Sequence, residues 1–189
     1  MKCSLPFLSL LLIPLLVPST SAQPAAPAAE MPDRVPAKPA DKEAGAVSRR
    51  DRRFVIEVLR INHNETVIAQ LVAERASTRQ VTALARQLIS DLGEATRELR
   101  ALAEKKHISL PEPRAESGEL KTWNEKALAA VDADYLGRAQ DALDDLATLY
   151  EKASVKSTDP ELVAFAKKLL PAVREQQKRA AEINPKVVP

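Results

Sequence analysis

The sequence predicts an all-α protein, an antiparallel four-helix bundle, and two observations lead to that fold class. Apolar residues recur three or four positions apart along most of the chain, and no stretch alternates strictly between apolar and polar residues as a half-buried strand does. Residues 46–92 contain neither glycine nor proline, so the helical spacing continues without an obvious break. With only one Trp, two Tyr and three Phe, the core must consist mainly of Leu, Ala, Val and Ile.

The first two helices are expected on either side of a tight break at residues 77–80. The first carries an apolar stripe that includes Phe54 and Val72, and Glu65 occupies a stripe position where a hydrophobic residue is expected. Residues 77–80 resemble a capping box, in which Ser77 accepts from a backbone amide one turn later and Gln80 reaches back. The second helix continues to about residue 102, and prolines at 111 and 113 follow it in a loop.

A third helical region is expected from about residue 117 to residue 150, with one break allowed at residues 130–132. Asp159 and Pro160 then restart the chain as an N-cap and a first-turn proline. The fourth helix should end near residue 184 and should be kinked by Pro171, which lies inside it. Long helices with short connections pack as an antiparallel bundle, so we expect the domain to span residues 47–185, followed by a short tail at 186–189.

Two segments before the domain carry a different signature. Residues 1–22 combine an early lysine, a leucine-rich run and small residues at positions 20–22, which is typical of a cleaved signal peptide. The apolar run is shorter than the ~20 residues of a membrane-spanning helix, although an uncleaved anchor is the alternative. Residues 23–46 contain five prolines and few large apolar side chains, which predicts a disordered linker that is either a spacer or a tail. Export would remove Cys3, the only cysteine, and leave a periplasmic protein without disulfides.

Several functional classes are excluded by composition and motifs. The chain has 28 Lys and Arg against 26 Asp and Glu, a net charge of +2, whereas nucleic-acid-binding domains concentrate a basic excess on one face. It contains no Gly-rich phosphate loop, no G-x-S-x-G elbow and no H-E-x-x-H zinc motif. We therefore expect neither enzymatic activity nor a cofactor, and no nucleic-acid partner. The sequence identifies no small-molecule substrate.

A series of short segments between residues 51 and 183 carries a family resemblance. The segments are Asp51-Arg52-Arg53-Phe54, Glu65, residues 71–77, Leu110-Pro111, residues 132–135, Leu149-Tyr150 and residues 159–171. Their order and spacing resemble a bacterial family of exported ferritin-like proteins, domain of unknown function family 4142. The resemblance implies a ferritin-like four-helix bundle that is exported or associated with the envelope, with no established reaction.

The chain departs from this family where metal ligands would be expected. Members commonly carry histidine at three positions that are Leu92, Leu143 and Gln176 here, all on the inward stripes of their helices. Among polar side chains at or near the inward stripes, the chain keeps Glu65 on its stripe and Asp91 beside one. These two residues are candidates for a vestigial metal site. A di-metal centre in a bundle requires roughly six to eight inward carboxylates and imidazoles. We therefore expect no bound metal.

Glu65 is nevertheless costly on an apolar stripe unless it is paired or protonated. We expect a partner from a neighbouring helix, either an arginine or a hydroxyl, and Gln176 is a further candidate. The alternative is a weak metal or proton site. Elsewhere, Trp123 and Tyr135 are expected to pack in the core rather than to form a ligand site.

The remaining candidates lie near helix ends or on the surface. Arg49, Arg50, Arg52 and Arg53 form a basic cluster at the start of the first helix, where cations oppose the helix dipole. The cluster is either a solvated helix end or a contact for anionic lipid headgroups or an acidic partner. The single Glu-x-x-His, Glu104 to His107, lies at a helix end and favours solvation over metal binding. His63 should face water, and Gly93 and Gly137 should allow close helix approach.

Taken together, these features predict an exported, non-catalytic cell-envelope bundle with a partner-binding or structural role. Its partner would be an envelope protein or an anionic membrane surface. The alternative is a ferritin-like metal-binding or oxidase protein whose metal site has degenerated.

Overall fold

Five helices form the part of the chain that the computed structural model describes, residues 47–112 and 117–184. They are α1 (Arg49–Arg75), α2 (Arg79–Lys105), α3 (Ser117–Glu125), α4 (Leu128–Lys156) and α5 (Pro160–Glu182). The signal peptide expected at 1–22, the linker at 23–46 and the tail at 186–189 lie outside these residues. None of the helices described is both long and apolar enough to span a membrane.

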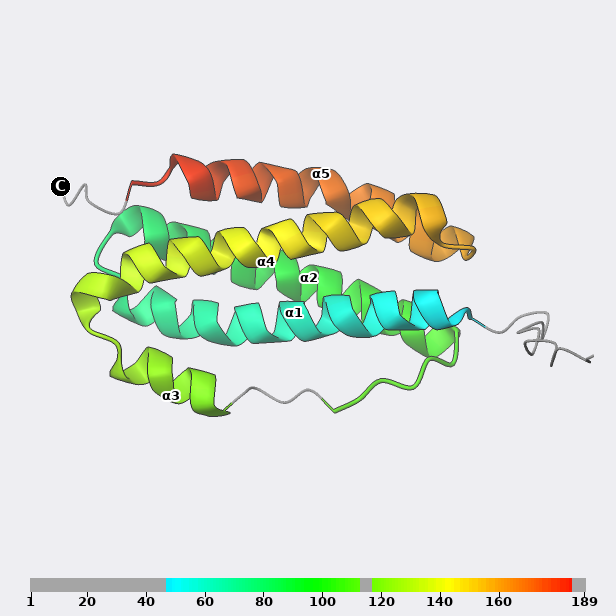
Figure 1. The fold of residues 1–189 in the computed structure, drawn as a ribbon, viewed down its shortest axis with the longest axis horizontal. Helices are drawn as coiled ribbons and strands as arrows, with labels where there is room; N and C mark the ends of the chain where they lie inside the picture. Colours follow the sequence, from blue (N-terminus) through cyan, green and yellow to red (C-terminus); the bar gives the residue numbers. More distant parts are fainter. Residues whose placement is uncertain (1–46, 113–116, 185–189) are drawn as a thin grey trace, which may run out of the picture. The chain divides into compact units, whose positions relative to one another are not determined.

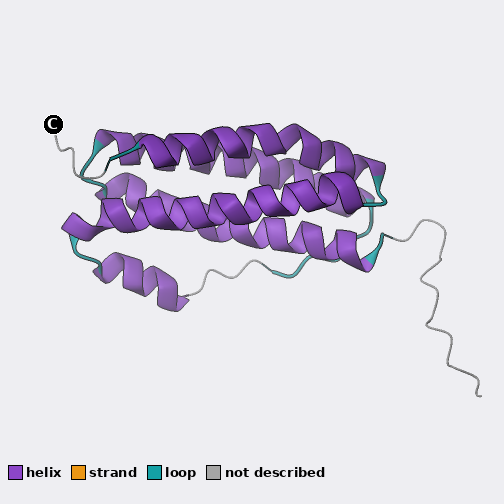
Figure 2. Cartoon of the chain, turned by 45° about the horizontal axis from the view of Figure 1, so that its top comes forward, coloured by secondary structure: helices purple, strands orange, loops and turns teal. Residues whose placement is uncertain are grey.

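The four long helices are arranged as two antiparallel hairpins packed on each other (Figure 1). The hairpins are α1–α2 and α4–α5; between them, α1 packs on α4, and α2 packs more sparsely on α5. The short helix α3 lies outside this set, against α1. Figure 2 shows only helices and connecting loops over the described residues, which confirms the all-α prediction.

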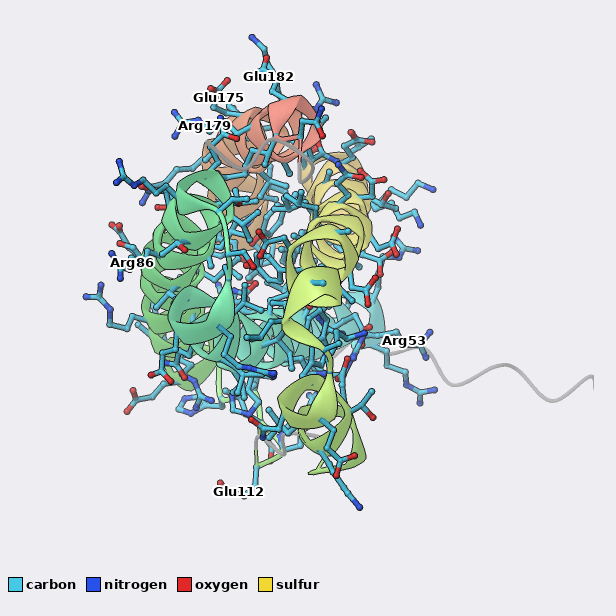
Figure 3. All side chains as sticks on the ribbon, turned by 90° about the vertical axis from the view of Figure 1, so that its left-hand side faces the viewer. Arg53, Arg86, Glu112, Glu175, Arg179 and Glu182 are labelled. Carbon is cyan, nitrogen blue, oxygen red and sulfur yellow. The ribbon has the colours of Figure 1, made fainter. Side chains whose placement is uncertain are left out.

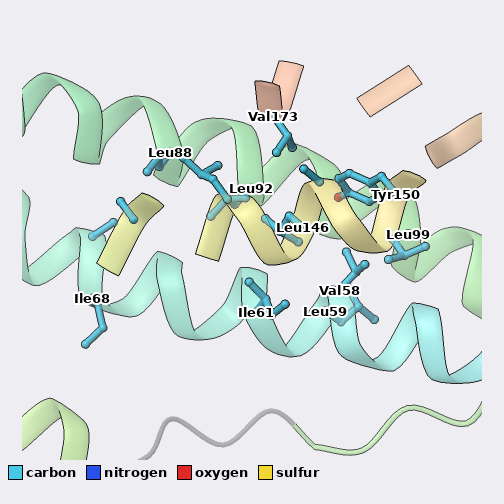
Figure 4. Close-up of a cluster of buried hydrophobic side chains, with 14 of the residues drawn as sticks. Val58, Leu59, Ile61, Ile68, Leu88, Leu92, Leu99, Leu146, Tyr150 and Val173 are labelled. Atoms are coloured by element: carbon cyan, nitrogen blue, oxygen red, sulfur yellow. The ribbon is translucent and has the colours of Figure 1, made fainter. Parts of the chain in front are cut away.

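The bundle separates apolar from charged side chains. Charged side chains project outward around the helices, as Arg53, Arg86 and Glu175 do in Figure 3. The core consists mainly of Leu, Ala, Val and Ile, as predicted, with aromatic rings at both ends. Figure 4 shows the interior, where Val173 of α5 points toward Leu92 and Leu146.

Two groups of rings fill the ends of that core. Tyr150 is the centre of one group, with edge-on ring contacts to Phe54 at 6.1 Å and to Phe165 at 5.9 Å between centroids. Trp123 and Tyr135 form the other at 6.4 Å, and both are buried, which confirms that they pack in the core. Edge-to-face geometry is the arrangement that aromatic quadrupoles favour.

The break in the third helical region lies at Lys126 and Ala127, not at residues 130–132 as predicted. Arg75 explains the shift, because its guanidinium donates to the carbonyl of Trp123 and, at 2.7 Å, to the carbonyl of Lys126. Carbonyls in the last turn of a helix lack intrahelical donors, and Arg75 satisfies that of Lys126, while the Trp123 carbonyl also accepts from the Lys126 amide at 3.4 Å. Asp132, placed in the break by the prediction, instead lies inside α4 and accepts from the Ser77 and Thr78 amides at 2.9 and 2.8 Å.

Helix ends agree only partly with the predicted caps. Asp159 caps α5 as expected, accepting from the amides of Glu161 and Leu162. The cap of α2 is Thr78, not Ser77, because Thr78 accepts from Val81 while the Ser77 amide donates to Asp132. Helix α5 continues on both sides of Pro171, which is exposed.

The two glycines inside helices do not mark a close approach between backbones. A Cβ placed on Gly93 or Gly137 would meet no side chain or neighbouring backbone within 4 Å. The prediction of close helix contact at these positions was therefore wrong.

Candidate functional site

Four of the predicted site positions line one small cavity between α2, α4 and α5. Asp91 and Leu92 reach it from α2, Leu143 from α4 and Gln176 from α5. Its volume is about 40 Å³, and its other walls are mainly aliphatic: Leu88, Ala95, Tyr150, Leu169, Ala172 and Val173. The structure thus brings together the three positions at which the family that the chain resembles commonly has histidine.

Gln176 pairs with Asp91, not with Glu65 as one of the alternatives proposed. Its side-chain Nε2 donates to Asp91 Oδ2 at 2.6 Å, joining α5 to α2. Gln87 donates to the other oxygen of Asp91 at 2.8 Å. Periodicity places Gln176 and Glu65 both inside, but Glu65 is held by an arginine of α4, while Gln176 is held by a carboxylate of α2.

The residues of this cavity do not fit a di-metal centre. Leu92 and Leu143 have no lone pair to offer a metal ion. Of the four positions, Asp91 and Gln176 therefore supply the oxygen ligands. Within residues 47–112 and 117–184, no three His, Cys, Asp or Glu side chains gather as a metal site would require. Inward carboxylates and imidazoles from facing helices are what metal bundles use.

Glu65 lies elsewhere, at the interface of α1 and α4. It is only 4% exposed, and its Oε1 accepts from Arg138 Nη2 at 2.8 Å, which confirms the expected arginine partner. Arg138 also contacts Glu119 of α3, so one guanidinium connects three helices. Burial raises the pKa of Glu65 to about 7, against the lowering effect of Arg138.

Some buried polar atoms in and beside this ion pair have no hydrogen-bond partner among the described residues. They are Glu65 Oε2, Arg138 Nε and the Tyr135 hydroxyl. Burial also raises the pKa of the Tyr135 phenol, with a further contribution from the Glu65 charge. Glu65 and Arg138 open onto a polar groove of about 640 Å³, whose acidic residues include Asp134, Asp141 and Asp145.

The basic cluster at the start of α1 is exposed and extends onto α4. Arg50 Nη1 donates to the backbone carbonyl of Lys156, in the last turn of α4, at 2.9 Å. Cations are favourable near a helix C-terminus. The nearby C-terminus of α4 therefore offsets the unfavourable position of the basic cluster at the N-terminus of α1. Asp51, buried in the first turn of α1, adds a negative charge and accepts from Ser48 and Thr158.

Lys152 and Lys156 of α4 complete this surface, which we name the basic end: Arg49, Arg50, Arg52, Arg53, Lys152 and Lys156. Four of these residues line a groove of about 420 Å³ whose floor includes Phe54, Leu149 and Ala153. Val155, between the two lysines, is 82% exposed. Sequence reasoning missed the α4 residues because they lie about a hundred positions from α1, and their proximity is revealed by contacts in the fold such as that of Arg50 with Lys156.

The two histidines have different surroundings. His107 is exposed after the end of α2, with a positive φ of 52°, and its amide donates to the carbonyl of Glu104. His63, expected to face water, is half-buried instead and lines a pocket of about 80 Å³ with Arg100 and Leu110. The segment around Leu110 covers this side of α1, which helical spacing alone does not reveal.

Comparisons with known proteins give a family and a fold. The profile described as "Domain of unknown function (DUF4142)" matches residues 36–183. Among solved structures, the chain is similar to the crystal structure of a DUF305 fragment from Deinococcus radiodurans. The TM-score is 0.64 at 15% identity, with 72% of this chain and 95% of that chain covered, so the likeness concerns the fold alone. No curated protein matches the chain.

Proposed function

Because the chain belongs to the DUF4142 family, whose defining domain has no assigned function, we propose a role from its geometry. The protein is an exported, non-catalytic cell-envelope bundle that binds an anionic membrane surface through its basic end. The observation that carries this proposal is the groove lined by Arg50, Arg53, Lys152 and Lys156.

The basic end combines the two features that a lipid surface requires. Basic residues near an anionic membrane contribute about 1 kcal/mol each, and an apolar side chain beside them can enter the headgroup layer. Val155 is such a side chain, because it is largely exposed and lies between Lys152 and Lys156 in sequence. The acidic neighbours are already engaged, since Asp51 accepts hydrogen bonds and Glu57 pairs with Arg60.

The position of the basic end along the chain supports the same role. The proline-rich linker expected at residues 23–46 joins the bundle at the start of α1, which is part of the basic end. Such a linker would allow the bundle to lie on the surface in the orientation that its charges select.

A non-catalytic role is supported by the cavity lined by the three positions at which members of the family commonly have histidine. Its walls are mainly aliphatic and include Leu92 and Leu143. The alternative of a degenerate metal site rests on Asp91 and Glu65, which lie on different sides of the bundle, one against α5 and one against α4.

Vesicle binding tests the proposal. The protein should sediment with vesicles of phosphatidylglycerol and phosphatidylcholine but not with phosphatidylcholine alone, and the bound fraction should fall as salt rises. A variant with Arg52, Arg53, Lys152 and Lys156 changed to Gln should lose most of this binding.

The matched control removes the same charge elsewhere, at Arg79, Arg86, Lys121 and Lys178, which are exposed on the rest of the bundle. This control should retain most of its vesicle binding. Equal losses in both variants would mean that net charge, not the basic end, is responsible. Absence of binding to anionic vesicles would contradict the proposal and favour an acidic protein partner.

A further inference from the structure

The polar groove between α1 and α4, helices that run side by side in Figure 1, carries more carboxylates than cations. Arg138 is shared between Glu65 and Glu119, so one guanidinium serves two acids. Asp141 and Asp145 also line the groove, and their carboxylates form neither an ion pair nor a hydrogen bond with the described residues. These two aspartates are one turn apart on α4, where like charges destabilise a helix.

The other cations of the groove are already engaged. Lys126 contacts Asp134 at 2.5 Å, and Arg60 contacts Glu57 at 2.7 Å. Each of these pairs is neutral, so neither offsets the charge of the two unpaired aspartates. The groove therefore has an excess of negative charge that the described residues leave uncompensated.

A buried carboxylate oxygen adds to this excess. Glu65 lines the groove although it is only 4% exposed, and its Oε2 has no hydrogen-bond partner among the described residues. Buried acceptors are normally satisfied. By itself this oxygen would accept from any donor, including water. Together with the charges of Asp141 and Asp145, it favours a cationic donor.

The shape of the groove favours an extended ligand over a compact one. Its volume of about 640 Å³ exceeds the about 150 Å³ that accommodates benzene. Ala133, Gly137 and Ala142 leave room along α4. A metal ion needs several ligands around one point, whereas no three His, Cys, Asp or Glu side chains gather in this way within the described ranges. A chain with several ammonium groups can instead contact carboxylates at separate points.

We propose that the polar groove binds a linear polyamine, with ammonium groups at Asp141 and Asp145 and a further one toward Glu65. Neighbouring ammonium groups of a polyamine lie about as far apart as side chains one helical turn apart, about 5–6 Å. The methylene segments lie along the small residues of α4, and each contact of an ammonium group with a carboxylate is a charge-assisted hydrogen bond. The site is separate from the basic end, because no residue of the basic end lines it.

Spermidine is the probe, added to the ¹⁵N-labelled protein at constant ionic strength and followed by amide chemical shifts. It should cause saturable shifts around Glu65 and Gly137. Asp141→Asn combined with Asp145→Asn should weaken spermidine binding by about tenfold or more, since two charge-assisted contacts are lost.

The chain offers a matched control on the same helix. Asp144 and Glu151 are exposed on α4 but do not line the groove; Asp144 accepts from Gln177, and Glu151 pairs with Arg174. Asp144→Asn combined with Glu151→Gln removes the same charge and should leave spermidine binding unchanged.

The protonation of Glu65 gives a second readout. Because its pKa is about 7, this carboxyl is mostly protonated at pH 6 and mostly ionised at pH 8. The charged and titratable groups that face it are Arg138 and Tyr135 of α4 and Glu119 of α3. Spermidine should bind up to about tenfold more tightly at pH 8 than at pH 6, and Glu65→Gln should remove most of this difference.

Two further probes distinguish other ligands of the same groove. An acetylated trilysine amide has the charge of spermidine and represents a basic protein segment, and Mg²⁺ represents a metal ion. Both should bind more weakly than spermidine. The proposal is overturned if either binds the groove more tightly, if the double aspartate variant binds spermidine as wild type does, or if the matched control loses as much affinity.

Discussion

Glu65 of α1 and Arg138 of α4 form an ion pair of 2.8 Å inside the bundle, and the same arginine contacts Glu119 of α3. A carboxylate buried to this extent retains a net desolvation cost even with its partner, so its pKa is raised to about 7. The pair therefore connects three helices and makes their stability depend on pH.

The first prediction concerns this pH dependence. Since the folded pKa of Glu65 is above its ordinary value of 4.5, its stabilising contribution is complete below pH 4.5 and is lost as pH rises through about 7. The free energy of unfolding should fall by up to about 3 kcal/mol across this window. Urea titrations of wild type and Glu65→Gln at pH 5 and pH 8 measure it, and the variant should show the smaller difference. An equal difference in both proteins would assign the effect to other groups.

The second prediction concerns the attachment of α3. Arg75→Ala removes the donors to the carbonyls of Trp123 and Lys126, so α3 should open more often while the four long helices remain folded. Hydrogen exchange in residues 117–125 should accelerate by about tenfold, a change in the free energy of local opening of about 1.4 kcal/mol. Arg79→Ala, at an exposed arginine, is the control and should leave α3 unchanged. Uniform acceleration over all helices would show that α3 does not open separately.

The third prediction concerns Asp132, which joins the start of α2 to α4. Asp132→Ala leaves the Ser77 and Thr78 amides without their acceptor, and the loss should be about 1–2 kcal/mol in the free energy of unfolding. Chemical denaturation measures this value against Asp145→Ala, an exposed residue of the same helix that should change stability little. A loss no larger than the control's would mean that water replaces the carboxylate.

The fourth prediction concerns metal. After aerobic loading with iron or manganese and desalting, the protein should retain far less than one ion per chain, because leucines occupy two of the inward positions. A triple variant, Leu92→His, Leu143→His and Gln176→His, places three imidazoles around one cavity and should bind divalent metal more tightly than wild type. Near-stoichiometric retention by wild type would contradict this expectation.

Much of the fold could be predicted from the sequence because it depends on local rules. Helical spacing predicts the long helices, and Asp159 before Pro160 predicts the start of α5. Periodicity also places Glu65 and Gln176 on inward faces, and both are buried. These features depend on neighbours within a few turns of the same helix.

The pairings between helices could not be predicted in the same way. Spacing shows which face of a helix is buried but not how far that helix is rotated against each neighbour, so Gln176 was a candidate partner for Glu65 rather than for Asp91. The end of α3 depends on Arg75, about fifty positions earlier, and the basic end depends on Arg50 meeting Lys156. Such contacts across the chain leave no local pattern.

The orientation of the bundle on a membrane tests the central claim most directly. With anionic vesicles that carry a gadolinium-chelating lipid, paramagnetic broadening of amide signals reports which residues approach the surface. We expect the strongest broadening at Arg53 and Val155 and little at Arg86, which is exposed near the start of α2. Uniform broadening, or broadening strongest at Arg86, would contradict the assignment of the basic end as the membrane-binding surface.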